Sequence, residues 1–111
     1  MSMVHATSEI RGGTLVVTVT IRRLDAAAAV GLAAALREQV RTRPLVVVSL
    51  AHVEAMDASG VGALLSLLQA MPPGGRIRLA SVRSSVRALL VATFLDELLP
   101  AFEDVPAALR A

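Results

Sequence analysis

The alternation of apolar and polar residues predicts five strands, the last of them short. Residues 14–21, TLVVTVTI, alternate threonine with β-branched residues after a Gly-Gly turn, and we expect them to pair in a hairpin with residues 4–9. Residues 45–50, LVVVSL, are an almost continuous apolar run, which is typical of a strand covered on both faces. Residues 76–81, RIRLAS, alternate charged and apolar side chains and predict a strand nearer an edge. A small last strand is expected near Ala101 and Phe102.

Four helical stretches lie between and after these strands. The first is expected to begin at the cap residue Asp25 and to end before Arg43-Pro44. The second runs from Ser59 to Met71, where Pro72 stops it. The third has Ser84 or Ser85 as its cap, and the fourth covers residues 105–110. In each of the first three, apolar residues recur at the spacing of one buried helix face.

Strands that alternate with helices imply crossover connections. The sequence therefore predicts an α/β fold: one domain over residues 1–111, with a mixed sheet of four to five strands and about four helices. In crossover units of this kind, the loops that leave the C-terminal ends of parallel strands gather at one edge of the sheet. Three such loops cover residues 22–25, 51–59 and 81–85, and we expect a functional site where they meet.

Composition narrows the classes of function. The chain of 111 residues has no cysteine, a net charge of +2 and only two aromatic residues, Phe94 and Phe102. Without aromatic platforms for bases or long runs of like charge, nucleic-acid binding is not expected. The longest apolar run, residues 26–36, is too short to cross a bilayer, and we see no secretory signal. We therefore expect a cytoplasmic protein without membrane insertion.

The sequence gives no sign of a bound cofactor or metal ion. Histidine, aspartate and glutamate do not cluster at ligand spacing, and cysteine is absent. The chain contains no lysine, so it cannot form a phosphate-binding loop that ends in Lys-Ser or Lys-Thr. We expect no cofactor and no metal.

The segment AMDASGVGALL, residues 55–65, places Ser59 at the start of the second helix. One interpretation is structural: Ser59, or Asp57, caps the helix and contributes about 1 kcal/mol. Gly60 and Gly62 favour a further role, because two glycines in the first turn leave the backbone open to a close-fitting partner. A catalytic nucleophile is not expected, because the hydrolase elbow has glycine where Asp57 and Val61 stand.

A longer stretch around this segment resembles a known family. The residues LVVVSLAHVEAMDASGVGALLSLL are similar to the signature segment of the STAS domain, and more narrowly to that of anti-sigma factor antagonists. That signature is an apolar strand, a loop, and then Asp-Ser/Ala-Ser/Thr-Gly-apolar-Gly opening a helix, here residues 57–62. The resemblance continues through Leu24-Asp25 and through residues 77–109, so it covers nearly the whole chain.

The resemblance implies a switch by phosphorylation and no enzymatic activity. The family's partner is both an anti-sigma factor and a serine kinase, which phosphorylates the serine that matches Ser59. The unmodified antagonist captures this kinase and frees a sigma factor; the phosphorylated form releases the kinase, and a phosphatase resets the cycle. We expect the partner to contact residues at the same sheet edge: Arg23, Leu24, Asp25, Asp57, Ala58, Ser59, Gly60, Val61 and Arg83.

A second role is compatible with the same resemblance. STAS domains also serve as small subunits of lipid-transport ABC complexes, where a similar loop docks on the ATPase and no kinase is needed. The arginines Arg22, Arg23 and Arg83 are expected at this edge, either in solvent or paired with acidic groups of the kinase or with the phosphate. Two positions depart from the family pattern: Arg22 and Phe94 each stand where the family commonly has glycine.

Overall fold

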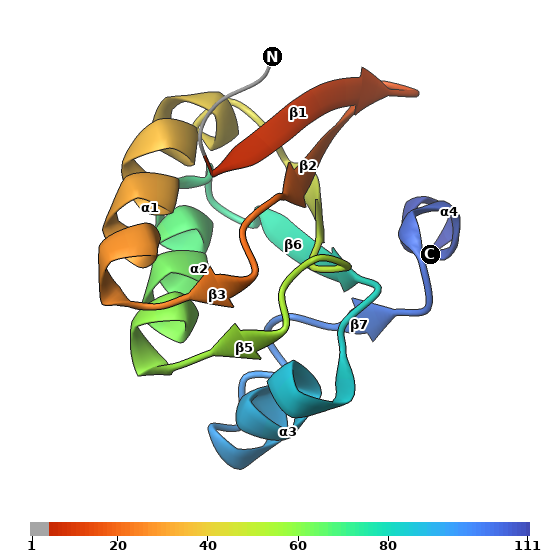
Figure 1. Ribbon diagram of the computed structural model, residues 1–111. Coiled ribbons are helices and arrows are strands. Elements are labelled where there is room, and N and C mark those ends of the chain that lie inside the picture. The colour runs from red at the N-terminus through yellow and green to blue at the C-terminus, as the bar shows by residue number, and fades with distance from the viewer. Residues whose placement is uncertain (1–4) are drawn as a thin grey trace.

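The computed structural model describes residues 5–111 and contains a five-stranded mixed sheet (Figure 1). The strand order is β1-β2-β4-β6-β7, with β1 antiparallel to β2 and every other neighbouring pair parallel. The strands are β1 (Ala6–Arg11), β2 (Thr14–Val19), β4 (Leu45–Ser49), β6 (Arg76–Ala80) and β7 (Ala101–Phe102). The first strand lies two residues later than expected, and Val4 is outside the described residues.

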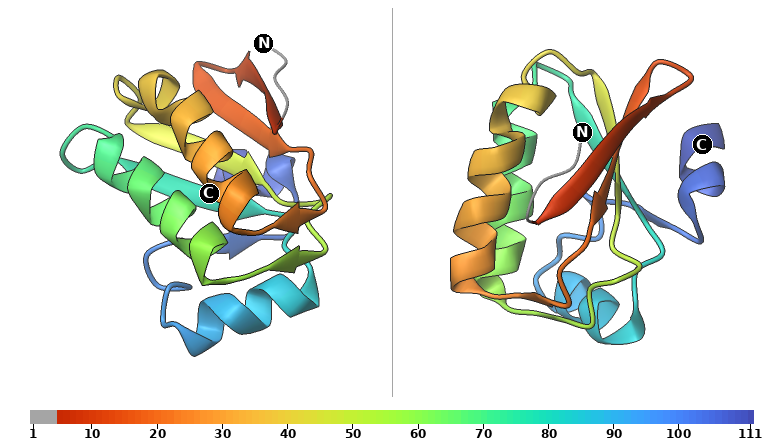
Figure 2. Two further views of the ribbon diagram at one scale, coloured as in Figure 1. Left: turned by 60° about the vertical axis from the view of Figure 1, so that its left-hand side comes forward. Right: turned by 45° about the horizontal axis from the view of Figure 1, so that its top comes forward.

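Four helices complete the domain, so the expected α/β class is confirmed. They are α1 (Ala26–Val40), α2 (Ala58–Ala70), α3 (Ser84–Ala92) and α4 (Val105–Arg110). In Figure 2, α1 and α2 cover one face of the sheet and α4 covers the other. Over residues 5–111, no helix is both long enough and apolar enough to cross a membrane.

The central strand β4 explains this two-sided arrangement. Val46 and Val48 face the main core together with apolar residues of α1 and α2, whereas Val47 faces a smaller cluster under α4 that includes Ala108. Successive strand residues point to opposite faces, so an unbroken valine run supplies both cores. The apolar run was interpreted correctly as a strand covered on both sides.

A second, two-stranded sheet was not expected from the sequence. β3 (Arg23–Leu24) pairs in parallel with β5 (Ala55–Met56), with Arg23 opposite Ala55 and Leu24 opposite Met56. Two of the segments expected to be loops, residues 22–25 and 51–59, are therefore joined by a short ladder directly before α1 and α2. Leu24 and Val53 are fully buried and attach these segments to the main core.

The start of α3 also differs from the prediction. Its N-cap is Arg83, which makes no side-chain capping bond, so neither Ser84 nor Ser85 is the cap. The Ser85 hydroxyl instead donates to the Glu54 carbonyl oxygen at 2.8 Å. A long-range bond to the loop before β5 has taken the place of the local cap that the sequence suggested.

Candidate functional site

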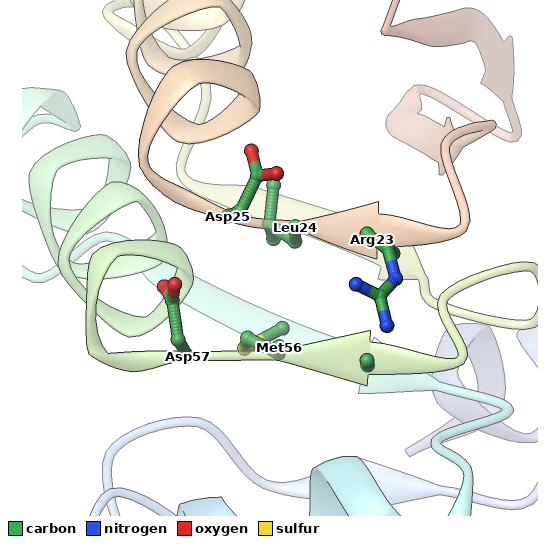
Figure 3. Close-up of a pocket in the computed structure, with 6 residues that line it drawn as sticks. Arg23, Leu24, Asp25, Met56 and Asp57 are labelled. Atoms are coloured by element: carbon green, nitrogen blue, oxygen red, sulfur yellow. The ribbon is translucent and has the colours of Figure 1, made fainter.

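The small sheet places the N-termini of α1 and α2 side by side (Figure 3). Each strand is followed by an aspartate that caps the next helix. The Asp25 carboxylate accepts from the Ala28 N–H at 3.1 Å, and the Asp57 carboxylate accepts from the N–H groups of Ser59 and Gly60 at 2.8 and 3.3 Å. A carboxylate at each of these positions accepts hydrogen bonds from N–H groups of the first helical turn, which have no partner within the helix. Its negative charge is also favourable at the positive end of the helix dipole. The edge thus carries two adjacent capped helix starts.

A shallow depression of about 170 Å³ lies between the two helix starts. It is lined by residues of β3, β5 and their caps: Arg23, Leu24, Asp25, Ala55, Met56 and Asp57. Figure 3 shows the two aspartates at the helix ends of the strands and the Arg23 side chain between the strands. The contributions of Ala55 and Met56 were missed because a two-residue strand has no readable periodicity.

Ser59 is the second residue of α2 and not its cap. Its backbone N–H is held by Asp57, and its half-buried side chain lines a groove of about 420 Å³ between α1 and α2. Within residues 5–111, the Ser59 hydroxyl makes no hydrogen bond with another group of the chain. The residue that caps α2 is therefore Asp57 and not Ser59. The hydroxyl faces an open groove and is not engaged in stabilising the helix.

Gly60 and Gly62 have different roles, although the sequence suggested one role for both. Gly62 is exposed, and a Cβ added there would meet nothing within 4 Å. Gly60 is buried, and a Cβ there would lie 2.5 Å from Met56 Cγ and 2.8 Å from the Leu24 carbonyl oxygen. Gly60 thus lets α2 pack closely on β3 and β5. The expectation of open backbone holds at Gly62 and is wrong at Gly60.

The loop between β4 and β5 is held by backbone and side-chain bonds. Arg83 Nε donates to the Ala51 carbonyl oxygen at 2.9 Å, and the Arg22 carbonyl oxygen accepts from the Glu54 N–H at 2.8 Å. The Arg22 side chain also forms an exposed ion pair with Glu54, at 3.4 Å between Nε and Oε2. Among the ion pairs within residues 5–111, none includes Arg23. Arg22 and Arg83 therefore have internal partners at this edge, whereas Arg23 is available to an external one.

The expected partner-contacting residues divide into two groups by burial. Leu24, Gly60 and Val61 are buried, so their side chains or backbone support the edge from beneath. The others reach the surface, Ser59 as a half-buried side chain and the rest as exposed residues: Arg23, Asp25, Asp57, Ala58 and Arg83. Over the part of the chain that the structure describes, no three His, Cys, Asp or Glu residues are grouped to hold a metal ion.

The cap of α2 gives a first testable prediction. Asp57→Ala should lower the free energy of unfolding by about 1 kcal/mol, because the Ser59 and Gly60 N–H groups lose their acceptor. Asp57→Asn keeps a side-chain oxygen at the same place and should cost only a fraction of that amount. Urea denaturation of the two variants measures the difference. Equal losses would show that charge, and not the capping bonds, stabilises this helix start.

Comparison with known proteins adds a family to this geometry. The family model described as the STAS domain matches residues 5–108. No curated protein sequence matches the chain significantly. Among solved structures, an anti-sigma-factor antagonist (STAS) domain protein from Planctomyces limnophilus has a TM-score of 0.88 at 20% identity, covering 98% of both chains. The anti-sigma factor antagonist SpoIIAA in its unphosphorylated form has a TM-score of 0.77 at 20% identity, covering 95% of this chain and 94% of that one.

The same fold also occurs in a protein of another kind. A sulfate transporter family protein from Wolinella succinogenes has a TM-score of 0.70 at 18% identity, covering 92% of this chain and 86% of that one. At identities this low, these likenesses establish the fold. The choice between possible functions therefore rests on the geometry of the edge around Ser59.

Proposed function

Because the chain belongs to the STAS domain family, we propose that it is an anti-sigma factor antagonist that phosphorylation of Ser59 switches off. In the unmodified state it binds an anti-sigma factor that is also a serine kinase, and so frees a sigma factor for transcription. The kinase transfers the γ-phosphoryl group of ATP to Ser59 Oγ, releasing ADP and the hydroxyl proton. A phosphatase hydrolyses the ester and restores the binding state. The protein itself catalyses no step.

The position of the Ser59 hydroxyl is the observation that carries this proposal. It lines an open groove and makes no hydrogen bond within residues 5–111, so a kinase can reach it without unfolding the helix. The backbone around it is fixed by the Asp57 cap and by the close packing of Gly60 on β3 and β5. A reachable hydroxyl on a rigid frame suits both docking and modification.

Phosphorylation changes the charge of this edge without supplying a new internal partner. A phosphoserine carries about −1.5 to −2 charges at neutral pH. A helix N-terminus attracts such a group, but the Asp57 carboxylate already accepts from the N–H groups of Ser59 and Gly60. Asp25 caps the neighbouring helix start and adds a second negative charge. The phosphate therefore remains on the surface as added bulk and charge, which repels a partner that fitted the bare hydroxyl.

The docking surface consists of the exposed residues around Ser59. Arg23 has no ion pair within residues 5–111, and we assign it to an acidic group of the kinase. Asp25, Asp57 and Ala58 lie beside the serine at the two helix starts. The buried residues Leu24, Gly60 and Val61 act through packing, and Arg83 acts by holding the Ala51 carbonyl.

Site-specific phosphorylation tests this function. The protein is incubated with ATP and the ATPases of the anti-sigma factor kinase type that are encoded near its gene, and tryptic peptides are read by mass spectrometry. The expected result is one phosphate, on Ser59, which Ser59→Ala abolishes. A chain that accepts no phosphate from any of these kinases, and that binds the ATPase of a lipid-transport ABC complex, would establish the alternative role of a transporter subunit.

A further inference from the structure

One side of the five-stranded sheet ends at β1. In the strand order β1 has β2 as its neighbour, and no strand within residues 5–111 pairs with its other edge (Figure 1). Native proteins protect such edges with proline, a bulge or a charged side chain that points inward. β1 has no proline, and its register with β2 is regular over all six residues. The edge of β1 is therefore a regular template for an additional strand.

The backbone groups of β1 alternate between those that face β2 and those that face outward. The Thr20 N–H donates to the His5 carbonyl oxygen at 2.9 Å, so the odd-numbered residues of β1 face β2. The N–H and C=O groups of the even-numbered residues consequently point away from β2. Those of Ala6 and Ile10 have no other partner within residues 5–111. An added strand would bond to these outward groups.

The two faces of β1 carry different side chains near its end. Ile10 lies opposite Leu15 of β2, which belongs to the main core, so Ile10 is on the face that α1 covers. Its side chain is nevertheless 51% exposed and borders a groove of about 450 Å³ between β1 and the end of α1. Glu9 and Arg11 point to the opposite face, where both are exposed and neither forms an ion pair within residues 5–111.

We propose that β1 pairs in antiparallel orientation with β1 of a second copy of this chain, around a two-fold axis at Ile10. Ile10 then lies opposite Ile10 of the second copy, and the two residues exchange backbone hydrogen bonds. Because residues equidistant from the axis face each other, Glu9 of each copy lies opposite Arg11 of the other. Opposite charges directly across an antiparallel pair stabilise it. The two sheets become one continuous sheet across the axis.

Charge selects both the register and the second copy as the occupant. An axis at Glu9 would place the two Glu9 carboxylates opposite each other, and like charges in that position are destabilising. An axis at Ser8 would leave Glu9 opposite Thr7, with no compensating charge. The axis at Ile10 pairs both charges of both copies. A strand that complements Glu-Ile-Arg in antiparallel orientation must itself read acid, apolar residue, base, and a second copy of β1 has this order.

The added ladder is short and lies far from Ser59. It covers residues 8–12 of each copy, so it buries much less than the roughly 800 Å² per partner of stable complexes, and the dimer depends on concentration. The groove beside Ile10 borders the C-terminal end of α1, whereas Ser59 lies beside the start of this helix, which has 15 residues and is about 22 Å long. The dimer is therefore independent of the proposed switch, and Ser59→Asp should associate like wild type.

Sedimentation velocity at concentrations from about 10 µM to about 1 mM tests the dimer. The wild-type protein should shift from monomer to dimer within this range. Ile10→Pro removes the outward N–H at the axis without removing a bond to β2, and it should weaken association at least tenfold; proline is tolerated on edge strands. Ile10→Val keeps this N–H and a β-branched side chain, and this matched control should associate like wild type. Urea denaturation shows whether both variants fold.

Charge exchange tests the register, and it decides the proposal even if Ile10→Pro does not fold. Glu9→Arg and Arg11→Glu should each weaken self-association at least tenfold, because each variant places like charges opposite each other. An equimolar mixture of the two should form a heterodimer, and the double variant should self-associate like wild type. Glu97→Arg changes the net charge by the same amount as Glu9→Arg at an exposed position outside β1, and this control should leave association unchanged.

Three results would overturn the proposal. A wild-type protein that stays monomeric up to about 1 mM would exclude the dimer. A dimer that survives both Glu9→Arg and Arg11→Glu would place the contact elsewhere on the molecule. A mixture of these two variants that does not associate would exclude the pairing of Glu9 with Arg11.

Discussion

Replacing Ser59 by aspartate should weaken the complex with the anti-sigma factor kinase about a hundredfold, whereas Ser59→Ala should keep the complex and make it insensitive to ATP. The serine hydroxyl lines the open groove between α1 and α2 and makes no hydrogen bond within residues 5–111. Alanine therefore removes little from the protein. Aspartate adds a third carboxylate beside those of Asp57 and Asp25, and a hundredfold loss corresponds to about 3 kcal/mol. Isothermal titration calorimetry measures both variants.

Ser66→Asp is the matched control for this prediction. Ser66 lies in the same groove, seven residues and thus about 10 Å farther along α2, where it contacts Arg37. The new carboxylate has a cation beside it, so this variant should lose much less affinity than Ser59→Asp. Equal losses at the two positions would show that any negative charge in the groove disturbs binding, and would remove the special role of Ser59.

The second large effect concerns stability. Gly60→Ala should lower the free energy of unfolding by about 1–3 kcal/mol, the range found for overpacked sites. The added methyl group would meet Met56 Cγ at 2.5 Å and the Leu24 carbonyl oxygen at 2.8 Å. A flexible methionine can move, but the backbone oxygen belongs to the β3–β5 ladder. The substitution must therefore push α2 away from the small sheet that frames the site.

Gly62→Ala provides the opposite expectation on the same helix. Nothing lies within 4 Å of a Cβ at this exposed position, so alanine should stabilise the protein by up to about 1 kcal/mol through its helix propensity. Urea denaturation of both variants measures the contrast. A Gly60→Ala protein as stable as Gly62→Ala would contradict the close packing of α2 on β3 and β5.

The larger elements could be predicted because each has a periodic signal. The valine run of β4 indicated a strand buried on both faces, and Val46, Val48 and Val47 divide between the two cores accordingly. The small sheet could not be predicted, because strands of two residues give no pattern and their pairing joins positions about 32 residues apart in sequence. The resemblance placed Leu24 among the residues that contact the partner. In the structure Leu24 is buried, because β3 pairs with β5.

The geometry of the candidate site could be predicted only in part. The motif around Ser59 indicated a helix start, and local chemistry left both Ser59 and Asp57 open as its cap; the structure assigns the cap to Asp57. The contrast between Gly60 and Gly62 depends on which helix face meets β3 and β5, which the motif alone does not show. The bonds of Arg83 and Ser85 to the β4–β5 loop connect residues 32 and 31 positions apart, respectively, so no local pattern indicated them.

The most direct test of the switch compares one protein in two chemical states. Protein phosphorylated stoichiometrically on Ser59, verified by mass spectrometry, and unmodified protein are titrated into the same kinase preparation, and the two dissociation constants are compared. The switch predicts that the phosphate raises the constant at least about a hundredfold. Treatment with a serine phosphatase should restore the original value. Equal constants for the two states would contradict the central claim that esterifying this hydroxyl releases the partner.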